Sequence, residues 1–136
     1  MTDYSELRQR MVEQQIEARG VRSEKVLEAM RRVPRELFLP EGLREFAYDD
    51  TPLPIEADQT ISQPYIVAFM TEGLALKGGE KVLEIGAGSG YAAAVLAEIA
   101  GEVYTIERIG DLASHAASTL AELGYENLEV IHADGT

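Results

Sequence analysis

The segment from Lys81 to Gly90, which reads KVLEIGAGSG, constrains the fold of this chain more than any other. Its short apolar run ends at three closely spaced glycines, Gly86, Gly88 and Gly90, and a helical pattern begins at Tyr91. A strand, a glycine-rich turn and a helix in this order bring the backbone of an α/β domain close to a nucleotide-like ligand. Glycine is required because a Cβ would block the ligand's approach and because the turn needs unusual backbone dihedrals.

The next apolar run ends at an acidic residue, Glu107. A carboxylate about 20 residues after the first glycine, at the tip of the second strand, is where such folds hold ribose hydroxyls. The spacing is not that of a dinucleotide fingerprint, because the third glycine comes one position early and Tyr91 stands where Gly or Ala is expected. No Gly-Lys-Ser/Thr follows the turn, which excludes a Walker loop. A turn that binds no ligand is the alternative.

Upstream of the turn, the sequence predicts three helices. The first spans Tyr4 to Arg19, the second is capped by Ser23 and ends at Pro34, and the third begins at Pro64. The stretch 35–63 between the second and third helices is predicted to be rich in loops. The buried side of the third helix is expected to consist of its large apolar residues, Ile66, Val67, Phe69, Met70 and Leu74.

Downstream, strands over 81–86, 102–107 and 128–132 alternate with helices over 90–100 and 109–123. This alternation predicts a parallel sheet with right-handed crossovers and the strand order 3-2-1. A doubly wound sheet usually has about six strands. We therefore expect a truncated chain rather than a small stand-alone domain. The outer edge of the first strand would then be bare and open to self-association.

Composition narrows the function. The net charge of −12 weighs against nucleic acid as a partner and leaves peptides and small molecules. The chain has no cysteine, so a disulfide, a zinc–thiolate site and a thiol nucleophile are excluded. No segment approaches the roughly 20 apolar residues of a membrane span. With a polar start, MTDYSELRQR, the sequence is expected to be cytoplasmic.

Longer motifs surround the glycine turn. They are RGV at 19–21, VPRELFLP at 33–40, AYDDTPLPI at 47–55, QTISQPYIVAFMTE at 59–72 and VYTIER at 103–108. Together with LEIGAGSGY, they closely resemble the protein-L-isoaspartate O-methyltransferase family, from the first helix to the last residue. The resemblance implies the Rossmann-like α/β fold of S-adenosylmethionine-dependent methyltransferases. It also implies one incomplete domain over 1–136, with a substrate-side helical region over 1–76 and a cofactor-binding βαβαβ half over 77–136.

The resemblance further implies an activity in protein repair. A methyl group would pass from S-adenosylmethionine to the free carboxylate of an isoaspartyl residue in a damaged protein, leaving S-adenosylhomocysteine. Ser62 would be the active-site residue, and the acceptor would lie along its neighbours Thr60, Ile61 and Gln63. The cofactor would be held by the turn, by Glu107 at the ribose and by a pair along the adenine, that is by Gly86, Gly88, Ser89, Glu107, Asp134 and Gly135.

The sequence departs from the family pattern at two of its own positions. Asp58 stands where the family usually has Gly before QTISQP, and Ala133 replaces the Gly that commonly precedes Asp-Gly. The later strands of the family, which help build the substrate pocket, do not follow Thr136. We therefore expect the parent protein to be the repair methyltransferase and this chain alone to be inactive or nearly so.

The residues suit this chemistry without a general base. An acceptor carboxylate with a reference pKa near 4 is already ionised at neutral pH. Ser62 would orient it by a hydrogen bond, although a role only as a helix cap is the alternative. His115 and His132 are expected to be structural, Asp49 and Asp50 to form a solvated turn, and no metal site is expected.

Two other functions stay open. One is a methyltransferase for another small acceptor that shares only the cofactor half. The segment QTISQPYIVAFMTE argues against it, because a different acceptor would not need that substrate-side motif. The other is a non-catalytic fragment that binds the cofactor weakly or self-associates through the bare strand edge.

Overall fold

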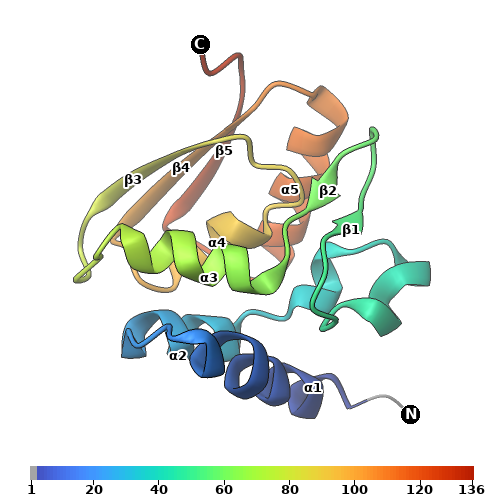
Figure 1. Cartoon of the computed structure of the whole chain (residues 1–136). Helices are drawn as coiled ribbons and strands as arrows, with labels where there is room; N and C mark the ends of the chain where they lie inside the picture. The colour runs from blue at the N-terminus through green and yellow to red at the C-terminus, as the bar shows by residue number, and fades with distance from the viewer. Residues whose placement is uncertain (1–2) are drawn as a thin grey trace.

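The three strands after residue 80 form one parallel sheet. In the computed structural model, which describes residues 3–136, the strands lie in the order β3-β4-β5. Their bounds are Lys81–Ile85 for β3, Glu102–Glu107 for β4 and Leu128–His132 for β5. The strands run parallel, with Ile85 opposite Ile106 in the register of β3 and β4. β4 therefore lies between β3 and β5 (Figure 1), and the predicted order 3-2-1 is confirmed.

The two crossover helices, α4 at Tyr91–Ala97 and α5 at Gly110–Glu122, pack on the same face of this sheet. A Cβ built on Gly90, which caps α4, would lie 3.3 Å from Ala116 and from Leu120 of α5. Right-handed crossovers that step in one direction across a sheet place their helices on one side. Both helices are those predicted, with ends one to three residues inside the predicted bounds.

The opposite face of the sheet is left open by residues 3–136. Along β4, Val103, Thr105 and Glu107 are buried, whereas the residues between them are only partly so. On β3, Leu83 and Ile85 are 61% and 59% exposed. Apolar side chains therefore cover part of the surface beside the outer edge of β3, which has no neighbouring strand in the described part of the chain.

The first two helical segments agree with the sequence. The first runs from Tyr4 to Arg19 but changes type along its length, as α1 (Tyr4–Met11), a π-helical segment (Val12–Ile16) and a 3₁₀ turn (Glu17–Arg19). The second, α2, spans Glu24–Arg32. Its predicted cap is confirmed, since the Ser23 hydroxyl oxygen accepts the Val26 N–H at 3.3 Å. The helix ends just before Pro34, as expected.

The predicted loop region contains short ordered elements. Two 3₁₀ segments, Arg35–Phe38 and Glu41–Phe46, are followed by a hairpin of β1 (Leu53–Pro54) and β2 (Thr60–Ile61). The hairpin was not predicted, because two-residue strands leave almost no periodic signal. Its turn places both Ala57 and Asp58 at positive φ, 58° and 56°.

The third helix, α3, spans Pro64–Gly73 and begins at the predicted residue. Its predicted buried side is largely wrong. Val67 is buried as expected, but the other four are exposed: Ile66 39%, Phe69 50%, Met70 69% and Leu74 53%. The buried residues instead recur at the helical spacing Pro64, Val67, Ala68 and Thr71. This smaller face packs on α2, the π-helical segment and α4, so the largest apolar side chains point away from the core.

The main core joins the N-terminal helices to α4 and α5. It includes Met11, Leu27, Met30, Val95 and Leu120, all nearly inaccessible to solvent. α3 and α2 lie side by side beneath the sheet (Figure 1). No helix within residues 3–136 combines the length and the apolar character needed to cross a membrane.

Candidate functional site

The glycine turn links β3 to α4 through left-handed backbone conformations. Gly86 and Gly90 have φ of 91° and 93°, which side chains strongly disfavour. The N–H groups of Gly86 and Ala87 both donate to the Ile106 carbonyl of β4, at 2.7 and 3.2 Å. The turn is thereby fastened to the end of the neighbouring strand.

Glu107, at the end of β4, lies directly beside this turn. Its Oε1 accepts the Gly88 N–H at 2.9 Å, and its Oε2 accepts the Ile109 N–H at 2.9 Å. The side chain is only 6% exposed. The structure thus brings together the turn and the acidic residue that the sequence paired, and the carboxylate fixes the turn. Each carboxylate oxygen keeps a second lone pair for a further donor.

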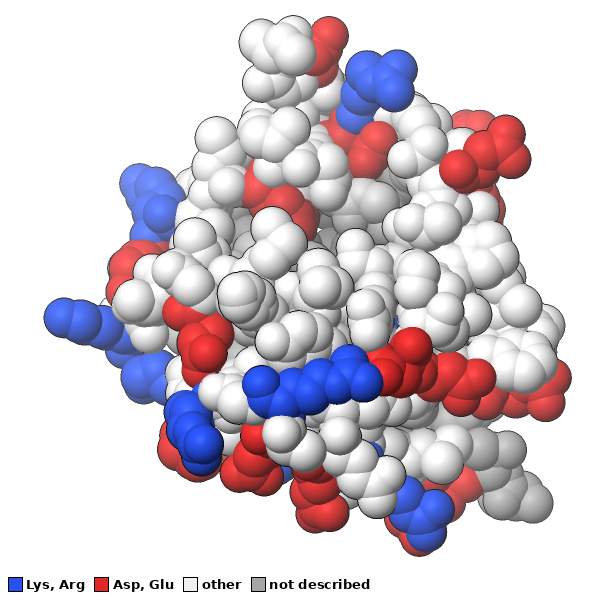
Figure 2. Space-filling view, viewed as in Figure 1, with Lys and Arg blue, Asp and Glu red and all other residues white. Residues whose placement is uncertain are grey.

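A cleft of about 430 Å³ opens between the hairpin, α3, β3 and the glycine turn. Of the predicted site residues, it is lined by Thr60, Ile61, Ser62, Gly86, Gly88 and Ser89. The face that carries α3 and β3 is largely uncharged around its hollow (Figure 2). The predicted acceptor side and the predicted cofactor turn therefore share one cavity, although they are more than 20 residues apart in the sequence.

Ser62 is exposed at this cleft, and its hydroxyl makes no hydrogen bond to any residue in 3–136. The N-cap residue of α3 is Gln63, and no side chain caps that helix. A role of Ser62 as a helix cap is therefore excluded. Its hydroxyl is free to contact a ligand.

Gln63 is directed elsewhere. Its Nε2 donates to Oδ1 of Asp50 at 2.5 Å, and the residue does not line the cleft. The same carboxylate accepts from the Arg19 guanidinium, which holds the pKa of Asp50 below its usual range, and Gln63 adds to that shift. The predicted solvated turn at Asp49 and Asp50 is thus exposed but tied by Asp50 to the first helical segment.

The predicted adenine-side pair follows β5. The Asp134 carboxylate accepts the N–H and the hydroxyl of Thr136, at 3.1 and 2.9 Å, and the N–H contributes most to lowering the pKa of Asp134. A Cβ on Gly135 would lie 2.6 Å from Cγ2 of Ile85, so the backbone passes close over the end of β3. This places the pair at the same edge of the sheet as the turn, but outside the residues that line the cleft.

Glu84 and Tyr91 also line the cleft but were not predicted as site residues. Glu84 accepts the Thr105 hydroxyl at 2.5 Å, and burial raises the pKa of its carboxyl to about 7, with a smaller contribution from the charge of Glu107. Tyr91 is 1% exposed and packs edge-on against Phe38, with ring centroids 5.6 Å apart. The alternation of side chains along β3 could have predicted that Glu84 is buried, because it lies on the same helix-covered face as Val82.

Neither histidine belongs to the cleft. His115 lies on α5 with its Nδ1 3.4 Å from Oε1 of Glu56, and Nε2 of His132 lies 3.1 Å from the Arg108 carbonyl oxygen. Across residues 3–136, no three His, Asp or Glu side chains are grouped so that they could hold a metal ion.

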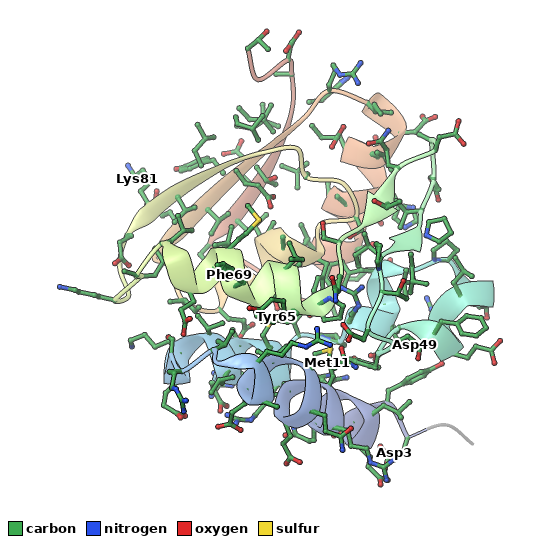
Figure 3. The ribbon with its side chains drawn as sticks, in the orientation of Figure 1. Asp3, Met11, Asp49, Tyr65, Phe69 and Lys81 are labelled. Atoms are coloured by element: carbon green, nitrogen blue, oxygen red, sulfur yellow. The ribbon has the colours of Figure 1, made fainter. Side chains whose placement is uncertain are left out.

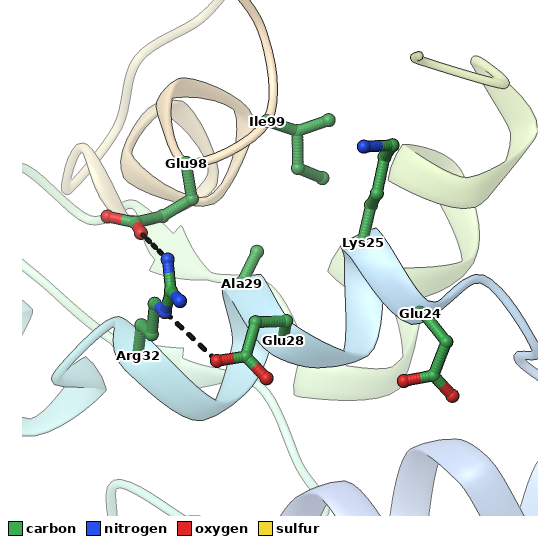
Figure 4. Close-up of a pocket in the computed structure, with 7 residues that line it drawn as sticks. All are labelled: Glu24, Lys25, Glu28, Ala29, Arg32, Glu98 and Ile99. Atoms are coloured by element: carbon green, nitrogen blue, oxygen red, sulfur yellow. Dashed lines mark hydrogen bonds and ion pairs between the residues drawn. The ribbon is translucent and has the colours of Figure 1, made fainter. Parts of the chain in front are cut away.

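A second hollow, of about 390 Å³, lies between α2 and the end of α4 (Figure 4). Three of its charged side chains pair with one another. Arg32 contacts Glu28 at 3.0 Å and Glu98 at 3.9 Å, and the other lining residues are Glu24, Lys25, Ala29 and Ile99. None of the predicted site residues lies there, so the cleft beside the glycine turn is the candidate site.

Comparison with known proteins agrees with this geometry. The family model described as protein-L-isoaspartate(D-aspartate) O-methyltransferase (PCMT) matches residues 6–136. The chain belongs to this family. It is 67% identical over 135 residues to protein-L-isoaspartate O-methyltransferase 1 of Rhodopseudomonas palustris (strain HaA2), which covers 99% of this chain and 55% of that protein. The resemblance seen in the sequence is confirmed.

Solved structures of the family share the fold. One protein-L-isoaspartate O-methyltransferase superposes with a TM-score of 0.84 at 31% identity, covering 94% of this chain and 42% of the other. A putative family member from Plasmodium falciparum, in complex with S-adenosyl-L-homocysteine, superposes with a TM-score of 0.77 at 26% identity, covering 98% and 64%. The predicted Rossmann-like methyltransferase fold is confirmed. The chain spans little more than half the length of the curated family member it was compared with above.

Proposed function

We propose that this chain is the cofactor-binding and Ser62-bearing part of an S-adenosylmethionine-dependent protein-L-isoaspartate O-methyltransferase. The single observation that carries the proposal is the cleft in which Ser62 and the glycine turn meet. A methyltransferase must hold its methyl donor and its methyl acceptor within contact distance, because proximity and orientation supply much of the rate gain.

The residues beside the cleft suit the cofactor. A Cβ on Gly86 would meet no atom within 4 Å, so this part of the turn opens onto free space. When bound, S-adenosylmethionine supplies the sulfonium methyl group that is transferred. In the proposal, Gly86, Gly88 and Ser89 hold its amino-acid part, Glu107 accepts from the ribose hydroxyls, and Asp134 and Gly135 lie along the adenine.

On the acceptor side, the proposal gives Ser62 an orienting role. Its unpaired hydroxyl donates to one oxygen of the isoaspartyl carboxylate and fixes the direction of the other. The carboxylate is ionised at neutral pH, so no side chain has to remove a proton. Thr60 and Ile61 line the cleft next to Ser62. Gln63 lies outside the lining and donates a hydrogen bond to Asp50.

In the proposal, two parts of the chain have separate roles. Residues 1–76 are the substrate-side region and residues 77–136 the cofactor-binding half. The repair of damaged proteins in the cytoplasm and the absence of a nucleic-acid partner stay predictions from the sequence, as does the low activity of this chain alone.

Two measurements test the proposal. Calorimetric titration with S-adenosylhomocysteine should show saturable one-to-one binding, and Ser62→Ala should leave the affinity unchanged. In the parent protein, methyl transfer to an isoaspartyl peptide should exceed transfer to the matched aspartyl peptide. Ser62→Ala should lower this transfer, while Ser114→Ala, on the exposed side of α5, should not. Absence of binding by the wild-type chain would contradict the assignment of the cofactor residues.

Self-association is a second candidate, because one observation favours it. The outer edge of β3 has no partner strand within residues 3–136, and Leu83 and Ile85 beside it are exposed. Unpaired apolar strand edges pair readily with other chains. Sedimentation should show an oligomer that grows with concentration, and Leu83→Lys should return it to monomer. A monomer at all concentrations would exclude this candidate.

A further inference from the structure

Arg35 is the largest fully buried side chain of the described protein, with 0% exposure. It begins the 3₁₀ segment Arg35–Phe38, far from the cleft in sequence. Its Nε donates to the Ala47 carbonyl at 2.6 Å, and its Nη2 donates to the Ser62 carbonyl at 2.9 Å. Its Cζ lies 4.8 Å from the centre of the Tyr91 ring.

This guanidinium has no acidic partner. Within residues 3–136, no carboxylate lies within 4.0 Å of it, and its Nη1 has no hydrogen-bond partner. Burial lowers the pKa of Arg35. A buried charge without a counter-ion costs free energy, so stability alone does not explain this residue. Arg8, which is also partly buried, differs because it contacts the carboxylate of Glu36 at 3.2 Å.

Arg35 contacts one residue from each side of the cleft. Ser62 comes from the acceptor side, and Tyr91 is the first residue of α4 after the glycine turn. Both line the cleft. The Ser62 side chain has no hydrogen bond to a residue in 3–136, so its position depends on its backbone. The bond from Arg35 to the Ser62 carbonyl holds that backbone at a fixed place relative to Tyr91.

We propose that Arg35 is a positioning residue that fixes the Ser62 peptide against the start of α4, so that the Ser62 hydroxyl faces the cleft beside the glycine turn. A guanidinium can donate the two directed N–H bonds while its Cζ lies over the Tyr91 ring. A lysine would keep the charge but could not donate from two fixed nitrogen positions at once. The role of the Ser62 hydroxyl toward an acceptor rests on the proposed function, whereas the clamp itself is a property of the fold.

The test compares Arg35→Lys and Arg35→Met with Met11→Ala, a core change in α1 at a residue that does not line the cleft. Amide hydrogen exchange is measured over residues 60–67 and over β4. Both Arg35 variants should lower protection over 60–67 by about tenfold more than over β4, because the opening is local. Met11→Ala should lower protection in both regions by the same factor.

Function provides the second measurement. S-adenosylhomocysteine affinity of the chain should stay within about twofold of wild type in Arg35→Lys. In the parent protein, kcat for the isoaspartyl peptide should fall about tenfold, as expected when only orientation is lost. If the wild-type chain does not bind S-adenosylhomocysteine, the proposed function fails, and the exchange result still decides the clamp.

Three results would overturn the proposal. They are full protection over 60–67 in Arg35→Lys, equal local losses in Arg35→Lys and Met11→Ala, or a loss confined to β4. Where an Arg35 variant does not fold, Tyr91→Leu removes the ring of the clamp and leaves Arg35 in place. It should lower protection over 60–67 more than over β4, and an unchanged ratio would also overturn the proposal.

Discussion

The pH dependence of stability tests whether the Glu84 carboxyl is buried in the sheet beside the cleft. This carboxyl lies on the helix-covered face of β3, accepts the Thr105 hydroxyl at 2.5 Å, and has a pKa raised by burial to about 7 from an ordinary value of 4.5. Replacement by glutamine keeps an oxygen that can accept from Thr105 and removes the titration. We therefore expect Glu84→Gln to change how stability depends on pH.

The sign follows from proton binding. Because the folded-state pKa lies above the unfolded one, the folded chain binds more protons between pH 4.5 and about 7. The stability of the wild type should therefore fall as the pH rises through that window. The full shift corresponds to about 3 kcal/mol at 1.36 kcal/mol per pKa unit. Glu84 borders the cleft, where water screens its charge, so we expect about 2 kcal/mol between pH 5 and pH 8.

The assay is urea unfolding at pH 5, 6, 7 and 8 with far-UV circular dichroism. Glu84→Gln should be close to wild type at pH 5 and more stable by about 2 kcal/mol at pH 8. The control is Glu129→Gln, an exposed residue of β5, which should keep the slope of the wild type. A difference between Glu84→Gln and wild type that is the same at all four pH values would refute the reasoning.

Three further predictions concern other parts of the chain. Asp58→Gly should raise stability by about 0.5 kcal/mol in urea unfolding, because Asp58 has φ of 56°, and a loss would contradict the turn geometry. Glu72→Ala should cost about 2 kcal/mol in the same assay, because its Oε2 accepts the two N–H groups before α2 at 2.7 and 2.8 Å. Gly135→Ala should weaken S-adenosylhomocysteine binding about tenfold by contact with Ile85, whereas Gly42→Ala, in open space, should not; equal affinities would remove Gly135 from the site.

The parts of the fold that were predicted correctly depend on short stretches of sequence. Apolar runs of strand length, each ending at a turn signal, fix β3, β4 and β5, and parallel connectivity then follows from the intervening helices. The glycine turn and Glu107 meet because the carboxyl ends of neighbouring parallel strands share one edge. In these cases, the local sequence pattern is enough to predict which elements form and which of their ends meet.

The errors arise where distant contacts decide the outcome. α3 was expected to bury its largest apolar residues, but small side chains allow closer approach of the neighbouring helices, so the face of Val67, Ala68 and Thr71 is buried instead. Tyr65 and Phe69 stack along the outside of α3 (Figure 3) with ring centroids 5.9 Å apart. Helical periodicity could not choose between these faces, because apolar residues occur around most of the helix.

The same distinction separates the two halves of the candidate site. The cofactor side is built from neighbours in one sheet, with Glu107 holding Gly88. The acceptor side has no such local frame, since the backbone of Ser62 is held by Arg35 and the next residue by Asp50. Changes at Arg35 or Asp50 should therefore displace Ser62 before they disturb the glycine turn. In the parent protein, binding of S-adenosylhomocysteine should survive substitutions of Arg35 or Asp50 that abolish methyl transfer, and the reverse pattern would show that the two halves do not separate in this way.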